Sequence, residues 1–142
     1  MVKKTITGAL TSGVVFVLFL LMACQGMQTT VAPERRIALH QGGPHDGSWE
    51  SQDVFIQYQY VKQPGTFTLK YGGHAKHAYD QVSVWVLFLD SQGKTLDTKS
   101  IFNSGFRQNL GRDKRSFEKT FEIPAGTTQF AFQSMLKARI GL

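Results

Sequence analysis

The sequence is poor in the residues that would specify a reaction. It holds a single cysteine, Cys24, among 142 residues, and one cysteine cannot form a disulfide within the chain. The folded part must therefore be stabilised by its own hydrophobic core. The 10 acidic residues are scattered, and no Ser, Cys or Thr stands in a pattern that supplies a base and an orienting group. We therefore expect no enzyme and no cofactor.

The chain also lacks an apolar run long enough for a membrane-spanning helix, which takes about 20 residues. Its longest run, Val14–Ala23, is shorter and follows Lys3 and Lys4. A basic start, a short apolar stretch and a small residue before a cleavage site are typical of a secretory signal peptide. The alternative is an uncleaved helix that extends back to Ile6 and takes in polar residues such as Thr11.

The end of this segment, Leu21–Cys24, resembles the lipobox of bacterial lipoproteins, with Leu first, a small residue before the cut and Cys directly after it. Met22 departs from the small or branched residue that the motif usually has there. The resemblance implies cleavage before Cys24 and a lipid anchor, such as palmitate, on that cysteine. Each buried CH₂ contributes about 0.8 kcal/mol, so several acyl chains would hold a small domain firmly.

The residue after the cysteine bears on the membrane that carries the protein. Lipoproteins with Asp at that position are commonly retained at the inner membrane, and this chain has Gln25. By resemblance we expect a lipid-anchored protein of the outer membrane that faces the periplasm. The formal net charge of +6 falls when Lys3 and Lys4 leave with the signal peptide. That modest charge and the envelope location argue against nucleic acid as a partner.

We divide the chain into a signal peptide at 1–23, a lipidated N-terminus with a flexible tether at 24–47, and one domain at 48–142. The polar stretch before the domain has no clear period, and the glycines and proline of 42–47 predict a loop there. The alternative for Ile37–His40 is a first edge strand.

Beyond Asp53 the dominant hydrophobic period is two, which predicts β-strands with one buried face. Gln81–Asp90 is apolar on both faces and predicts a central strand, whereas Lys119 on the apolar face of its segment suggests an edge strand. Asp90–Lys94 predicts a tight hairpin loop with Gly93 in the left-handed region. The expected strands cover 54–61, 66–71, 81–90, 95–102, 116–123 and 128–136, and the chain ends could add one or two.

This rhythm predicts an all-β fold, a single two-layer antiparallel β-sandwich of about six to eight strands. An immunoglobulin-like, a transthyretin-like and a jelly-roll topology all remain open. The segment Ala125–Phe132 is loosely similar to small bacterial lipoproteins of unassigned role, which carries over no functional residue.

Two groups of residues are candidates for ligand binding. Arg107, Arg112, Lys114 and Arg115 form a basic segment between strands, which could bind an anionic glycan or a lipid headgroup. A solvated loop is the alternative interpretation of the same charges. Aromatic side chains can stack on sugars. Trp49 and Tyr79 lie outside the clearest strands, so they are the aromatic residues that we expect to be exposed.

The histidines offer a weaker hypothesis. His74 and His77 could share a metal ion with Asp80 as a third ligand, but a zinc site takes three or four ligands and Lys76 between the histidines repels a cation. We expect exposed loop histidines and no metal. A catalyst would need a cleft that joins the same three residues.

The sequence therefore supports two hypotheses of different classes. The first is a lipid-anchored envelope β-sandwich that acts as a protein-interaction or structural module and binds another envelope protein. The second is a binder of an anionic glycan, a lipid headgroup or another small ligand through its loops.

Overall fold

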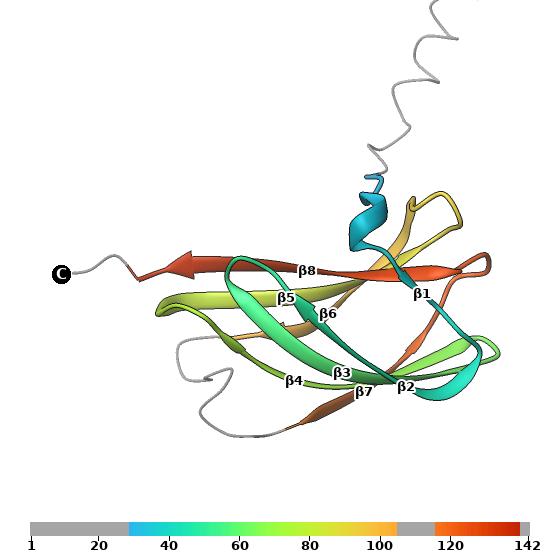
Figure 1. Ribbon diagram of the computed structural model, residues 1–142, viewed down its shortest axis with the longest axis horizontal. Coiled ribbons are helices and arrows are strands. Elements are labelled where there is room, and N and C mark those ends of the chain that lie inside the picture. The colour runs from blue at the N-terminus through green and yellow to red at the C-terminus, as the bar shows by residue number, and fades with distance from the viewer. Residues whose placement is uncertain (1–28, 105–115, 140–142) are drawn as a thin grey trace, which may run out of the picture.

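The computed structural model describes residues 29–104 and 116–139, and it folds as two four-stranded antiparallel sheets packed face to face (Figure 1). The predicted all-β sandwich is thereby confirmed. One short 3₁₀ helix, η1 (Pro33–Arg35), precedes the strands. The strands are β1 (Ile37–Ala38), β2 (Gly42–Glu50), β3 (Val54–Gln63), β4 (Thr66–Ala75), β5 (Tyr79–Leu89), β6 (Thr95–Asn103), β7 (Phe117–Glu122) and β8 (Gln129–Ala138).

The strand order defines the two layers. The upper sheet in Figure 1 has the order β1-β8-β5-β6, and the lower sheet has the order β2-β3-β4-β7. Consecutive hairpins join β2 to β4, whereas the chain changes sheet between β1 and β2, between β4 and β5, and on both sides of β7. As a result β1 and β2 lie at one side of the sandwich, and β6 and β7 lie at the other.

The core lies between the sheets because alternate side chains of each strand point inward. Val82, Val84, Val86 and Phe88 of β5 are fully buried. From the other strands come aromatic rings, among which Phe67 contacts Phe88 and Phe130 with ring centroids 5.4 and 5.3 Å apart. The remaining buried members of this cluster are Val54, Ile56, Tyr60, Leu69, Tyr71, Ile101, Phe102 and Phe132.

A second, smaller cluster lies on the outer face of the upper sheet. Leu87 and Leu89 of β5 and Ala131 of β8 are buried there, with Val31 and Trp85 packed against them. Val31 belongs to the segment before η1, so this segment covers part of that face. The apolar residues on the inner face of β5 therefore pack in the main core, and those on its outer face pack in the smaller cluster. The predicted central position of β5 is confirmed, because this strand pairs with β8 on one side and β6 on the other.

The predicted turn at Gly93 and the predicted edge strand with Lys119 are confirmed as well. The β5–β6 hairpin turns at Gly93, whose φ of 80° lies in the left-handed region. A carboxylate oxygen of Asp90 accepts hydrogen bonds from the backbone N–H groups of Gln92 and Lys94, at 2.9 and 3.0 Å. β7, which contains Lys119, is an edge strand, because among the described strands it pairs only with β4.

The expected loop at 42–47 is wrong, because these residues form the first part of β2. Gly42 and Gly43 have positive φ angles, and the register of β2 against β3 shifts between Gly42 and His45. Glycine and proline, which usually interrupt regular structure, are accommodated here by a bulge in an edge strand. The domain's strands therefore begin before Ser48.

The predicted flexible tether is likewise wrong for its described residues, 29–47. They hold η1, β1 and part of β2, and the alternative edge strand within 37–40 is confirmed as the two-residue β1. The remaining tether residues, 24–28, lie outside the described part of the chain.

Candidate interaction site on the open side of the sandwich

One side of the upper sheet is left largely unpaired. β8 pairs with β5 along its full length, from Gln129 to Ala138. On its other side β1 pairs only through Ile37 with Phe130 and Ala38 with Gln129. No strand among residues 29–104 and 116–139 pairs with that side of 131–138. We call this the open side: the side bordered by β1, β2 and the unpaired stretch of β8.

Side chains from β2 and β8 join the two sheets at the open side. Trp49 of β2 packs against Phe132 of β8, with ring centroids 5.5 Å apart. Ser51, directly after β2, lies with its hydroxyl oxygen 3.0 Å from that of Ser134 in β8. The Ser51 hydroxyl also accepts a hydrogen bond from the backbone N–H of Val54 at 3.0 Å. It therefore stabilises both the β2–β3 turn and the contact between the sheets.

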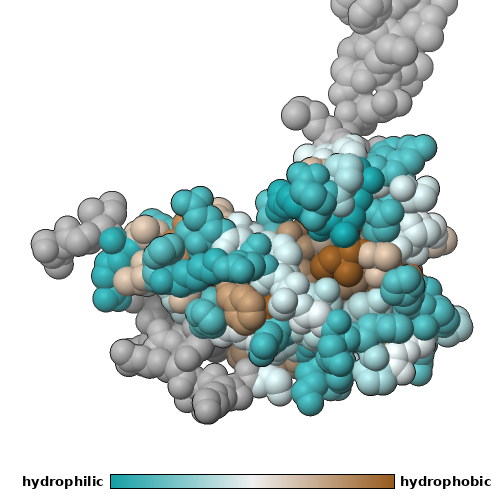
Figure 2. Space-filling view, in the orientation of Figure 1, coloured by the Kyte–Doolittle hydropathy of each residue, from teal (hydrophilic) through white to brown (hydrophobic). Residues whose placement is uncertain are grey.

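A groove of about 390 Å³ lies between η1 and the end of β2. Figure 2 shows hydrophobic surface directly below the polar surface of the η1 region. Trp49 and Ile37 give the groove its apolar part, and the rest of its lining is Glu34, Arg35, Arg36, Ser48, Glu50 and Ser51. This volume falls in the range of small-molecule sites, but two acidic and two basic side chains line it.

A second hollow, of about 480 Å³, lies along β2 and is lined by Asp46, Gly47, Ser48, Gln57 and Tyr58. A Cβ atom at Gly47 would overlap the Tyr58 ring, so the glycine lets that ring lie close to β2. Burial raises the pKa of the Tyr58 phenol, and neighbouring Tyr60 adds to the effect.

The segment before η1 is fixed to the β5–β6 hairpin. The backbone N–H of Val31 donates to the carbonyl of Gly93 at 2.9 Å, and the carbonyl of Thr29 accepts from the backbone N–H of Thr95 at 3.2 Å. Arg36 reaches back to donate to the carbonyl of Val31 at 2.7 Å. Its guanidinium lies where a Cβ of residue 93 would be, so glycine is needed there for packing as well as for backbone conformation.

The two aromatic candidates differ from the expectation of exposure. Trp49 is only partly exposed, because β2 directs it between the sheets, yet it lines the groove at the open side. Tyr79, the first residue of β5, is also partly buried and packs against the main core cluster. Of the two, only Trp49 belongs to the candidate site.

The possible metal ligands do not come together. No group of three or more His, Cys, Asp or Glu suited to a metal ion occurs within the described residues, which include all three candidates. The ring of His74 packs against Phe55 of β3, with centroids 5.4 Å apart. Asp80 accepts a hydrogen bond from Arg139 at 3.3 Å, and His77 is exposed in the loop after β4. The cleft that a catalyst would need is therefore not formed by these residues.

Other predicted residues lie outside the described part of the chain. Arg107, Arg112, Lys114 and Arg115 fall within 105–115, and Cys24 falls within 1–28. In the part that is described, no helix is long and apolar enough to cross a membrane.

A tyrosine fixes the far side of the sandwich. The Tyr71 hydroxyl, from β4, donates a hydrogen bond to the backbone carbonyl of Ile101 in β6 and so links the two sheets. Burial raises the pKa of Tyr71 to about 12. We assign the Tyr71 hydroxyl a structural role, because Tyr71 and Ile101 are both buried.

Comparison with known proteins adds no relative: no protein family, no curated protein and no solved structure matches this chain.

Most residues of the open side have no recognisable signal in the sequence. Ser51, Ser134 and Glu34 are common surface residue types without a distinctive spacing. Which of them meet depends on the order of strands in the two sheets, and a period of two does not encode that order.

Proposed function

We propose that this protein is a lipid-anchored envelope β-sandwich that binds another envelope protein at its open side. The observation that carries the proposal is the side of β8 that no strand pairs with over 131–138 in the described chain. Backbone N–H and C=O groups along such an edge are a template for an incoming strand. The partner is therefore expected to offer an extended segment.

The groove supports the same mode of binding. Added strands gain affinity from main-chain hydrogen bonds and specificity from pockets for alternate side chains. A strand that continues the line of β1 along β8 would run beside the groove, where Trp49 offers an apolar contact. Glu34, Arg35 and Glu50 would provide polar contacts around it.

The proposal of a lipid anchor rests on the signal peptide pattern and the lipobox resemblance of Leu21–Cys24. The contacts of Val31 with the β5–β6 hairpin are compatible with it, because they fix the chain near the predicted anchor to the domain. An anchor of this kind would hold the open side close to other envelope components.

The groove gives little support to the anionic-ligand alternative. Its two acidic residues, Glu34 and Glu50, balance Arg35 and Arg36. Arg36 already donates to the carbonyl of Val31. A site that selected an anion would need an excess of free cationic donors.

Photo-crosslinking in living cells tests the proposal. A photoreactive amino acid replaces Glu34, which lines the groove, or Glu118 of β7 as a matched exposed control at the opposite side. We expect one defined adduct with an envelope protein from position 34 and none from position 118. An Arg35→Glu change in the groove should weaken that adduct.

The adduct identifies the binding mode as well as the partner. Mass spectrometry of the crosslinked peptide should find the partner's contact in an extended segment. Equal crosslinking at both positions, or no adduct from position 34 in a folded and exported protein, would contradict the proposed site.

A further inference from the structure

The segment next to the predicted anchor runs over the outer face of the upper sheet. Val31 packs there against Leu87, Leu89 and Ala131. Thr29 and Val31 are held to the β5–β6 hairpin by backbone hydrogen bonds. In Figure 1 this segment and η1 lie above the upper sheet, on the side away from the lower sheet.

The chain between the predicted lipid and this segment is short. Five residue steps separate Cys24 from Thr29, so even a fully extended link spans at most about 18 Å. The two sheets of a sandwich pack about 10 Å apart. A lipid at Cys24 would therefore be joined to the domain within about 18 Å of Thr29, on the outer side of the upper sheet and not on that of the lower sheet.

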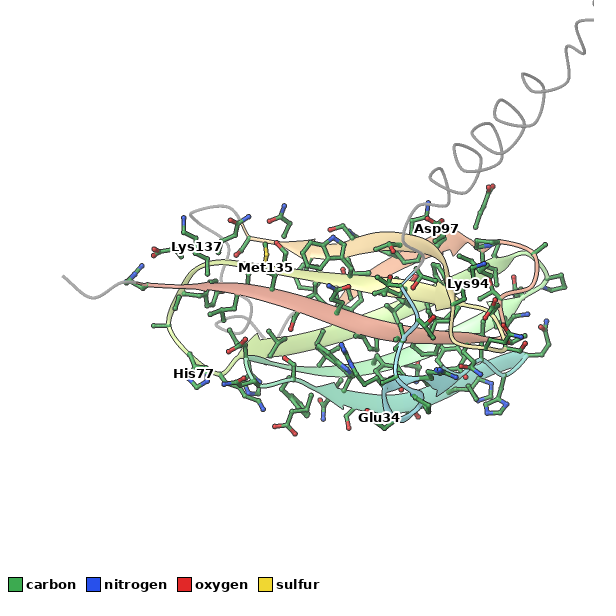
Figure 3. All side chains as sticks on the ribbon, turned by 90° about the horizontal axis from the view of Figure 1, so that it is seen from above. Glu34, His77, Lys94, Asp97, Met135 and Lys137 are labelled. Carbon is green, nitrogen blue, oxygen red and sulfur yellow. The ribbon has the colours of Figure 1, made fainter. Side chains whose placement is uncertain are left out.

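The uncovered part of the upper outer face combines apolar side chains with a lysine among neutral polar residues. Figure 3 looks down on it, with Met135 and Lys137 along β8 and with Lys94 and Asp97 toward the opposite end. Met135 is 53% exposed, and Trp85 of β5 is partly exposed beside the same strand. By strand register the outward positions of β5, β6 and β8 include Lys137 and no carboxylate. The two carboxylates of these strands each have a cationic partner: Asp97 forms an ion pair with Lys99, and Asp80, at the bulge of β5, forms one with Arg139.

The lower sheet has the opposite charge on its outer face. Of the three lysines in its strands, only Lys70 is at an outward position, because Lys62 and Lys119 pair with the inward residues Phe67 and Leu69. The carboxylates at outward positions are Asp46, Glu50, Glu118 and Glu122. Anionic lipid headgroups attract lysine and arginine and repel carboxylates. The charge asymmetry therefore favours the same orientation as the short link.

We infer that the protein lies flat on the membrane, with the outer face of the upper sheet against anionic phospholipid headgroups and the lower sheet turned away. This orientation rests on the lipid anchor of the proposed function. It leaves the open side, with β1 and β2, at the flank of the molecule and accessible to a partner in the same membrane.

Three exposed glutamines provide matched positions for a label that reports distance from the lipid headgroups, because they differ mainly in the part of the domain on which they lie. Gln133 is on the upper outer face, Gln57 on the lower outer face, and Gln92 at the tip of the β5–β6 hairpin. Each is changed to Cys in the full chain, purified from membranes, and labelled with an environment-sensitive fluorophore. An acylated Cys24 has no free thiol, so the label enters at one site.

The labelled proteins are reconstituted in vesicles of phosphatidylethanolamine and phosphatidylglycerol that carry a quencher on a fraction of the headgroups. We expect the labels at Gln133→Cys and Gln92→Cys to be quenched at least about twofold more than the label at Gln57→Cys, which would lie about 10 Å or more farther from the lipid. The difference should shrink when a neutral phospholipid replaces phosphatidylglycerol.

The outcomes separate the orientation from the anchor. Quenching at Gln92→Cys alone would mean that the protein stands on its hairpin, and equal quenching at Gln133→Cys and Gln57→Cys would mean a freely tumbling domain. Either result overturns the inference while the protein still floats with the vesicles. If the protein failed to float with the vesicles and a second label entered at Cys24, that cysteine would carry a free thiol and no lipid. This result would overturn the lipid anchor of the proposed function.

Discussion

The backbone N–H of Val31 donates a hydrogen bond to the carbonyl of Gly93 across 2.9 Å, and this bond holds the segment before η1 to the β5–β6 hairpin. Thr29 and Thr95 extend the contact by a further backbone hydrogen bond at 3.2 Å. A segment that looks like a linker in the sequence is therefore part of the sandwich. If Cys24 carries lipid, the domain is held close to the bilayer rather than at the end of a long tether.

Gly93→Ala should loosen this segment. Gly93 and Gly126 both have positive φ angles, of 80° and 86°, so alanine at either position costs roughly 1 kcal/mol in backbone strain. At Gly93 the added Cβ would also overlap the Arg36 guanidinium, whereas at Gly126 nothing lies within 4 Å.

The expected result is a larger loss of unfolding free energy for Gly93→Ala than for Gly126→Ala, by about 1–2 kcal/mol as is usual for overpacking. The Val31 amide should also exchange hydrogen faster in Gly93→Ala. Equal losses and an unchanged Val31 amide would mean that Arg36 does not hold the segment to the hairpin.

Ser51→Ala should cost more than Ser134→Ala. Ser134 loses only the hydroxyl contact between the sheets at 3.0 Å, expected to contribute about 0.5–1 kcal/mol. Ser51 also accepts from the N–H of Val54, a fully buried residue, and leaving that N–H unsatisfied costs about 1–3 kcal/mol. Urea unfolding of both single variants and the double variant measures the coupling between the hydroxyls. A larger loss for Ser134→Ala would contradict the assigned role of Ser51.

Tyr71 should make stability fall at alkaline pH. Its pKa is raised to about 12 in the folded protein by burial, against 10.0 ordinarily. Its contribution is therefore complete below pH 10 and is lost as the pH rises toward 12, on the order of 1–3 kcal/mol in all. Tyr58, whose pKa is also raised, adds to the same trend.

Tyr71→Phe should flatten this alkaline decline while lowering stability at neutral pH, because the buried carbonyl of Ile101 loses its donor. Chemical denaturation across the alkaline range checks both effects. A decline of unchanged steepness in Tyr71→Phe would show that another group causes it.

Trp49→Ala should destabilise the contact between the two sheets at the open side. The ring packs between the sheets against Phe132, and removing a large aromatic side chain from such a position costs about 2–4 kcal/mol. Trp85→Ala is the matched control, since Trp85 packs against the small cluster on the outer face and should cost less. Thermal unfolding compares the two. A smaller effect at Trp49 would mean that this ring does not close the gap between the sheets.

The strands that could be predicted from the sequence are those in which apolar and polar side chains alternate with a period of two residues. β3 and β5 follow from alternating side chains, and the two-sided hydrophobicity of β5 correctly places it in the middle of its sheet. The start of β2 was not predicted, because Gly42 and Gly43 usually interrupt regular structure. They are accommodated here because β2 is an edge strand with a bulge and has no strand on its other side in the described chain. The position of Trp49 inside the sandwich follows from β2 and is missed with it.

The remainder depends on contacts between distant parts of the chain. The bond from Val31 to Gly93 joins backbone groups, which carry no residue-specific signature. The unpaired stretch of β8 results from the shortness of β1 and from the order of the strands. Neither is written in side-chain periodicity, so the open side becomes visible only in the folded arrangement.

The most direct test of the account is the mass of the native protein extracted from its own membranes. We expect a chain that starts at Cys24 and carries several acyl chains on that residue. An N-terminal leader still in place, with an unmodified thiol at Cys24, would contradict the lipid anchor and the orientation that follows from it.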